Sequence, residues 1–95
     1  MADLHELVHF MDAELRTAEV PDYDVAMNGL QLANSGTVKK IAAAVDFSAN
    51  TIAGAVREEA DLLVVHHGMF WGGTRAITGI VYDRLYAAIG SDLAL

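Results

Sequence analysis

Two adjacent histidines, His66 and His67, follow a short apolar run and precede a glycine. Neutral imidazole is the commonest protein ligand for metal ions, so this pair predicts a metal site. Successive residues of a regular strand point to opposite faces, which argues against both rings binding one ion. With a turn at Gly68, each ring could bind a different ion of a two-metal site, as in metal-assisted hydrolases. The alternative is one buried histidine with a backbone partner beside an exposed one.

Asp46 ends a second apolar run and is the other candidate for chemistry. A carboxylate there could bind a metal, orient a metal ligand or act as a general base. It could equally be an ordinary turn residue that precedes a helix. His5 and His9 are four residues apart, a spacing that can chelate zinc from a helix. We expect these two histidines to lie on a solvated helix face.

Composition limits the classes of function that the chain can serve. The 95 residues carry a formal net charge of −7, which argues against nucleic-acid and anionic-membrane partners and favours cations. Cysteine is absent, which excludes disulfides, thiolate metal sites and thiol nucleophiles. No apolar run approaches the roughly 18 residues that cross a membrane, and the first residues lack signal-peptide features. We therefore expect a cytoplasmic protein.

Hydrophobic spacing predicts alternating helices and strands after an N-terminal helix. We expect helices over about 4–17, from Ser48 to about 59, and from about 80 to Gly90. Ile52, Ala55 and Val56 would form the inner stripe of the second helix, and the apolar residues that predict the third are Ile80, Val81, Leu85, Ala88 and Ile89. Buried strands are expected at 40–46 and 62–65, residues 92–95 resemble the opening of another, and residues 21–37 are turn-like.

This order predicts an α/β fold, with a three-layer parallel sheet built from βαβ units. Ligands of such sheets gather outside the carboxyl ends of the strands. Asp46 ends one predicted strand and His66 and His67 follow the next, so we expect all three at one edge of the sheet.

Two further segments allow both a structural and a functional interpretation. Residues 28–31 (Asn-Gly-Leu-Gln) are either a structural turn or donors of hydrogen bonds at the rim of the site. Met69, Phe70 and Trp71 are most simply packing residues beside the site. A solvent-facing Trp71 would instead indicate a stacking or subunit surface.

Three segments in order and at similar spacing resemble the Nif-three-like dinuclear metal centre family, also known as GTP cyclohydrolase type 2 homologues. They are Asn28-Gly29-Leu30-Gln31, Val38-Lys39-Lys40-Ile41-Ala42-Ala43-Ala44-Val45-Asp46-Phe47-Ser48 and Asp61-Leu62-Leu63-Val64-Val65-His66-His67-Gly68-Met69-Phe70-Trp71.

The resemblance implies two divalent metal ions, of which Zn, Mn, Fe and Mg are candidates, and a ring-shaped homohexamer. His66 and His67 match the paired ligands of the family, one for each ion. The remaining ligands of the family have no counterpart within the 95 residues, so we expect the N-terminal part of a single, incomplete α/β domain. Two imidazoles alone hold such ions weakly, and we expect little activity from the chain by itself.

The leading hypothesis is a divalent-metal-dependent hydrolase, in which water attacks a purine ring carbon or a phosphoester of a small-molecule substrate. Asp46 would orient or deprotonate that water. GTP is the substrate that the family name suggests, but no residue pattern indicates guanine recognition. The alternatives are a non-catalytic metal-binding scaffold or regulatory interaction protein, and a purely structural segment.

Overall fold

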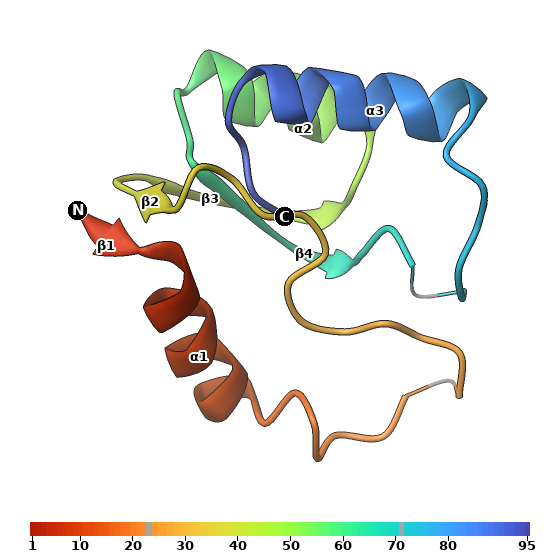
Figure 1. Ribbon diagram of the computed structural model, residues 1–95. Coiled ribbons are helices and arrows are strands. Elements are labelled where there is room, and N and C mark those ends of the chain that lie inside the picture. Colours follow the sequence, from red (N-terminus) through yellow and green to blue (C-terminus); the bar gives the residue numbers. More distant parts are fainter. Residues whose placement is uncertain (23, 71) are drawn as a thin grey trace.

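The structure is a computed structural model that describes residues 1–22, 24–70 and 72–95. Figure 1 shows a sheet with α1 on one side and α2 and α3 on the other. The elements are β1 (Ala2–Asp3), α1 (Leu4–Leu15), β2 (Thr37–Val38), β3 (Ile41–Asp46), α2 (Ala49–Arg57), β4 (Leu62–His67) and α3 (Gly79–Gly90). None of the described helices is long and apolar enough to span a bilayer.

The predicted parallel sheet is confirmed. Strands β3 and β4 pair in parallel from Ile41 opposite Leu62 to Asp46 opposite His67. On the other side of β4, Ala94 forms a parallel bridge with Leu62, within the segment 92–95 where the sequence predicts the opening of a further strand. Leu95 in turn exchanges backbone hydrogen bonds with Leu32, which ties the 27–32 segment to the sheet.

Capping residues set the starts of two helices. The Asp3 carboxylate accepts a hydrogen bond from the Glu6 backbone at 3.0 Å and starts α1. Ser48 and Thr51 form a reciprocal capping box at the start of α2. Helix α1 ends at Leu15, two residues earlier than predicted, because Arg16 adopts a left-handed conformation (φ 55°). The antiparallel pairing of β1 with β2 was not predicted.

Apolar side chains pack on both faces of the sheet. On the α2 and α3 side, Leu63 at 2% exposure lies in a cluster with Ile52, Ala55, Ala88 and other residues. On the α1 side, Leu62 packs with Leu4, Val38 and Ala94. The three alanines of β3 disfavoured a strand by propensity, yet Ala42 and Ala44 pack against the first cluster, where small side chains permit close helix–sheet contact.

The predicted inner stripe of α2 is wrong in part, because Val56 is 37% exposed whereas Ile52 and Ala55 are buried. Three of the five apolar residues that predicted α3, Val81, Leu85 and Ala88, are buried as one face of the helix. The other two, Ile80 and Ile89, are 66% and 63% exposed.

A polar cluster holds the amino ends of the strands together, at the edge of the sheet opposite Asp46. The Asn34 side-chain amide lies within 3.1–3.3 Å of the carbonyl oxygens of Thr37, Asp61 and Asp92. The Asp61 carboxylate accepts hydrogen bonds from the backbone of Lys39 (2.7 Å) and Lys40 (3.0 Å). These two hydrogen bonds, Lys39 first, hold the pKa of Asp61 below its usual value.

Candidate metal centre

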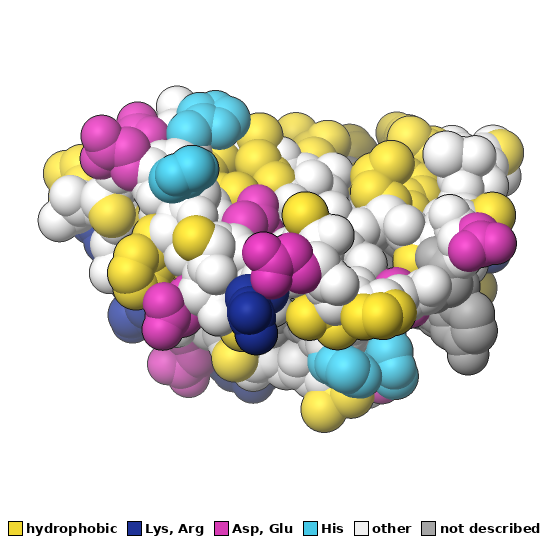
Figure 2. Space-filling model, turned by 90° about the horizontal axis from the view of Figure 1, so that it is seen from below, with side chains coloured by type: hydrophobic (Ala, Val, Ile, Leu, Met, Phe, Trp, Pro, Cys, Tyr) yellow, Lys and Arg dark blue, Asp and Glu magenta, His cyan; other side chains and the backbone are white. Residues whose placement is uncertain are grey.

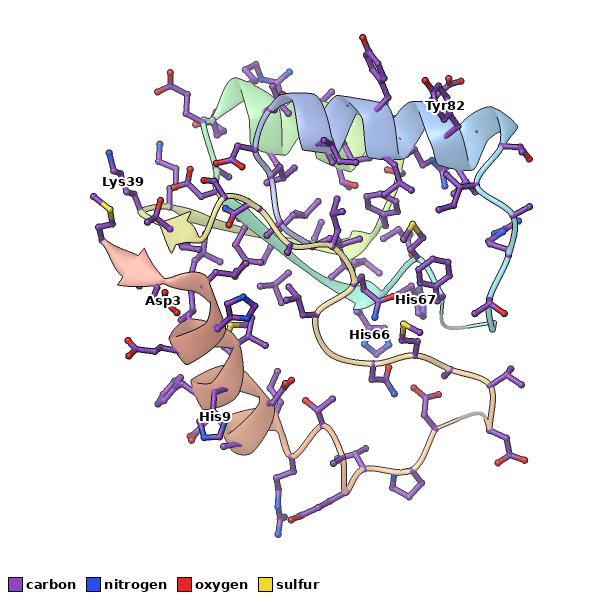
Figure 3. The ribbon with its side chains drawn as sticks, in the orientation of Figure 1. Asp3, His9, Lys39, His66, His67 and Tyr82 are labelled. Carbon is purple, nitrogen blue, oxygen red and sulfur yellow. The ribbon has the colours of Figure 1, made fainter. Side chains whose placement is uncertain are left out.

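His66 and His67 are the last two residues of β4, not the first two residues beyond it. Both side chains are exposed at the carboxyl end of the strand, and their ring centroids lie 4.6 Å apart with an angle of 48° between the ring planes. Figure 3 shows the two labelled rings together at this end of β4, far from His9 on α1. The alternative of one buried and one exposed histidine is therefore wrong.

Asp46 joins this pair from the neighbouring strand. The parallel register places Asp46 opposite His67, and its Oδ1 lies 2.8 Å from His67 Nδ1. The His67 and Asp46 side chains are 48% and 63% exposed, so the contact lies at the surface. A carboxylate that is hydrogen-bonded to Nδ1 fixes the orientation of the imidazole ring and leaves Nε2 to bind a metal ion. Of the roles considered for Asp46, its position fits the orienting carboxylate.

The two histidines border different cavities. His66 borders a cavity of about 130 Å³, between β4, α1 and the 27–31 segment, with Met11 and Gln31 among its walls. His67 borders a second cavity of about 270 Å³, together with Asp46, Ser48, Arg75 and Arg84. Alternation along the strand thus sends the two side chains to opposite sides, while their rings still meet at the tip.

Residues 28–31 form a turn that is fastened to the segment after β4. Gln31 donates from its side-chain amide to the carbonyl oxygens of Met27 (2.7 Å) and Gly29 (3.2 Å), and its Oε1 accepts from the Phe70 backbone (3.3 Å). A methyl group on Gly68 would come within 3.4 Å of the Gln31 side chain. These hydrogen bonds confirm the structural turn, while hydrogen bonding from residues 28–31 to a substrate stays a prediction.

His5 and His9 lie exposed on α1, as predicted. Figure 2, which views the molecule from below, shows histidine side chains at two separate places on that face. The segment His5-Glu6-Leu7-Val8-His9 matches the His-Glu-x-x-His pattern of zinc metalloproteases. However, no group of three or more His, Asp or Glu side chains within the described ranges is arranged to hold a metal ion. Among those residues, therefore, neither the pair on α1 nor the pair at the end of β4 has a complete set of metal ligands.

Met69 packs against the core cluster on the α2 and α3 side, as expected for a packing residue. The Phe70 backbone contacts Gln31 and Met27, whereas Trp71 lies outside the described residues. Sequence reasoning missed Arg75 and Arg84, which line the His67 cavity. No motif marked these two arginines.

Known proteins resemble this chain in sequence and in fold. Residues 2–95 match the family model of Duf34/NIF3 (NGG1p interacting factor 3). The chain belongs to the Duf34/NIF3 family. The three motifs at 28–31, 38–48 and 61–71 predicted this membership, which is confirmed.

Curated relatives of this Duf34/NIF3 chain bear the name GTP cyclohydrolase 1 type 2 homolog. One from Deinococcus radiodurans is 46% identical over 90 residues, which is 95% of this chain and 34% of the relative. One from Halobacterium salinarum is 53% identical over 78 residues, 80% of this chain and 31% of the relative. A crystal structure of a Thermus thermophilus protein superposes with a TM-score of 0.91 at 40% identity, covering 99% of this chain and 38% of that one. The chain thus spans about a third of the length of the relatives that it matches.

Proposed function

We propose that this Duf34/NIF3 chain supplies His66 and His67 to a two-metal site of a divalent-metal-dependent hydrolase. The observation that carries the proposal is the meeting of two exposed imidazoles, 4.6 Å apart, at the carboxyl end of an interior strand. Metal ions of two-metal hydrolases lie about 3.5–4 Å apart, a spacing that neighbouring rings can serve. The names of the curated relatives support a cyclohydrolase-type reaction for the whole protein.

The side chains that the chain offers are of a type that binds such ions, but they are too few to complete a coordination sphere. Imidazole suits zinc, iron and manganese, and Asp46 on Nδ1 would leave His67 to bind an ion through Nε2. Carboxylate ligands, which these ions also use, would come from residues other than the pair. Because two imidazoles form only part of a coordination sphere, this chain by itself should bind metal weakly.

The roles of the residues follow from their positions. Divalent ions would supply Lewis-acid activation of water and of the bond under attack. His66 and His67 would hold the ions at the strand tip, and Asp46 would fix the orientation of the His67 ring. Gln31 would keep the 27–31 turn against the 68–70 segment, which limits the movement of Gly68 directly after the ligands. The substrate would be a small molecule such as GTP or another phosphoester, bound within a homo-oligomer.

Metal titration of the chain and of histidine variants tests the proposal. Zn²⁺ or Mn²⁺ binding, measured by calorimetry, should weaken at least tenfold in His66→Ala and His67→Ala. His5→Ala and His9→Ala are matched controls, because they remove exposed histidines from α1, and binding should not change. If the controls abolish binding while His66→Ala preserves it, the metal is on α1 and the proposal is wrong. Tight binding of two ions to this chain alone would contradict the shared site.

Turnover needs the rest of the ligand set. A chimera in which this chain replaces the matching segment of the Deinococcus radiodurans relative provides it. With Mn²⁺, Zn²⁺ or Fe²⁺, hydrolysis of GTP or a simple phosphoester should be lost in the His66→Ala chimera and kept in the His5→Ala chimera. Equal turnover in both would refute catalysis through the pair.

A further inference from the structure

The His67 cavity concentrates positive charge in an otherwise acidic chain. Only six of the 95 residues are Lys or Arg, and the formal net charge is −7. Two of those six, Arg75 and Arg84, nevertheless line the same cavity of about 270 Å³. Arg75 lies in the segment between β4 and α3, and Arg84 lies in α3, which Figure 1 shows beside α2 on the same side of the sheet.

Among the described residues, neither guanidinium forms a salt bridge with a carboxylate. Within residues 1–22, 24–70 and 72–95, the salt bridges join Arg16 to Glu19 and His67 to Asp46, and none involves Arg75 or Arg84. Asp46 also lines the cavity, but its Oδ1 is held at 2.8 Å from His67 Nδ1. The two arginines therefore outnumber the single carboxylate of the cavity, whichever charge His67 carries.

Arg84 also carries a polar group that lacks a partner. Its Nε is the one buried side-chain nitrogen or oxygen, among the described residues, without a hydrogen-bond partner. A buried N–H without an acceptor is costly, so Arg84 has no hydrogen bond through Nε that would compete with a ligand for its guanidinium group. The Arg84 side chain lines the cavity, and guanidinium groups suit phosphate oxygens in geometry as well as charge.

The start of α2 adds to the same field. Ser48, the N-cap residue of this nine-residue helix, lines the cavity. The amino end of a helix carries partial positive charge, and α2 has no acidic residue in its first turn to offset it.

We infer that Arg84 and Arg75 form a phosphate-binding subsite beside His67, and that the substrate of the proposed metal site carries a phosphate group. The inference that a substrate carries the phosphate group rests on the proposed function. Phosphate binding itself depends only on the cavity. A phosphate held there would lie next to His67, so a phosphorylated substrate would present its reacting bond to the strand tip.

The test observes the Arg84 Nε–H group directly, by ¹⁵N NMR of the metal-free 95-residue chain in EDTA, with inorganic phosphate as the probe. We expect a saturable shift of this resonance, which chloride at equal ionic strength does not reproduce. Arg75→Gln should weaken phosphate binding about tenfold, and Arg84→Gln should abolish the saturable shifts of neighbouring backbone amides. Arg57→Gln, an exposed arginine at the end of α2, is the matched control and should bind like the wild type.

The outcomes test the phosphate subsite separately from the proposed metal site. Equal binding in all three variants, or the same response to chloride, overturns the subsite. If Arg84→Gln does not fold by circular dichroism, Arg75→Gln in its exposed segment decides the question alone. Saturable phosphate binding together with failure of the zinc titration would retain the subsite and refute the proposed function, and the reverse result would refute the subsite only.

Turnover of the chimera tests whether the substrate carries the phosphate. The kcat/KM for a phosphorylated substrate should fall at least tenfold on Arg75→Gln, whereas the kcat/KM for its dephosphorylated counterpart should not change. If Arg75→Gln weakens binding of free phosphate but leaves kcat/KM for the phosphorylated substrate unchanged, the subsite binds product and the inference about substrate is wrong.

Discussion

Removal of the Asn34 side chain should destabilise the fold without touching the candidate metal centre. The Asn34 amide lies near three carbonyl oxygens, and its Oδ1 accepts from the Gly36 backbone at 2.8 Å. Two amide hydrogens shared among three acceptors amount to about two hydrogen bonds, and Oδ1 adds a third. At about 0.5–1 kcal/mol for each bond at a half-buried position, Asn34→Ala should cost about 2 kcal/mol.

For a domain of this size, about 2 kcal/mol corresponds to a fall in Tm of roughly 10 °C. Circular dichroism during heating, together with urea unfolding at pH 7, measures both quantities. Asn50→Ala is the matched control, because Asn50 is exposed on α2, and its Tm should stay within about 2 °C of the wild type. If Asn34→Ala and Asn50→Ala unfold at the same temperature, the polar cluster does not hold the strand ends together. Zinc affinity below the Tm should be unchanged in both variants, since Asn34 lies at the opposite edge of the sheet.

Three further perturbations test other parts of the fold. Leu63→Ala should cost about 3 kcal/mol in urea unfolding because Leu63 is 2% exposed, whereas Ile89→Ala, at 63% exposure, should cost less than about 0.5 kcal/mol; similar values would refute the core assignment. The folded pKa of Asp61 lies below its unfolded value, so its stabilisation is present above about pH 4 and is lost as the pH falls through the folded pKa. Urea unfolding between pH 6 and pH 3 should therefore show a shallower loss in Asp61→Asn than in the wild type, and parallel curves would contradict this cause. Gly29→Ala should destabilise by about 1–2 kcal/mol because its φ is +93°, while Gly90→Ala should be neutral or stabilising, and equal Tm values would show that residues 28–31 tolerate a side chain there.

Local signals carried the parts of the fold that the sequence predicted correctly. Ser48 before an apolar helical stripe marked the start of α2, and apolar runs that end at Asp46 and at the histidines marked the parallel strands. Each of these signals lies within one element and its cap. The pairing of Ala2 with Val38 could not be read in this way, because two-residue strands carry no periodicity and their partners are 36 residues apart.

The arginines of the His67 cavity were missed for a related reason. Net charge is a property of the whole chain, and −7 argued against anions. Local potential depends instead on which side chains the backbone brings together. Arg75 and Arg84 are nine residues apart in a segment without a motif, and only the path from β4 to α3 places both beside His67. An acidic chain can therefore contain a cationic cavity that composition hides.

The register of β3 and β4 determines the chemistry available at the strand tip. Asp46 lies opposite His67, which gives the 2.8 Å contact between Oδ1 and Nδ1. A slip of one residue would place Asp46 opposite His66 or Gly68 and would turn the apolar faces of Leu62 and Leu63 to the wrong helices. Because Leu62 and Leu63 are 3% and 2% exposed in separate clusters, such a slip would disrupt both sides of the core. The apolar run before the histidines therefore fixes which imidazole receives the carboxylate, and packing in the core sets the geometry at the surface.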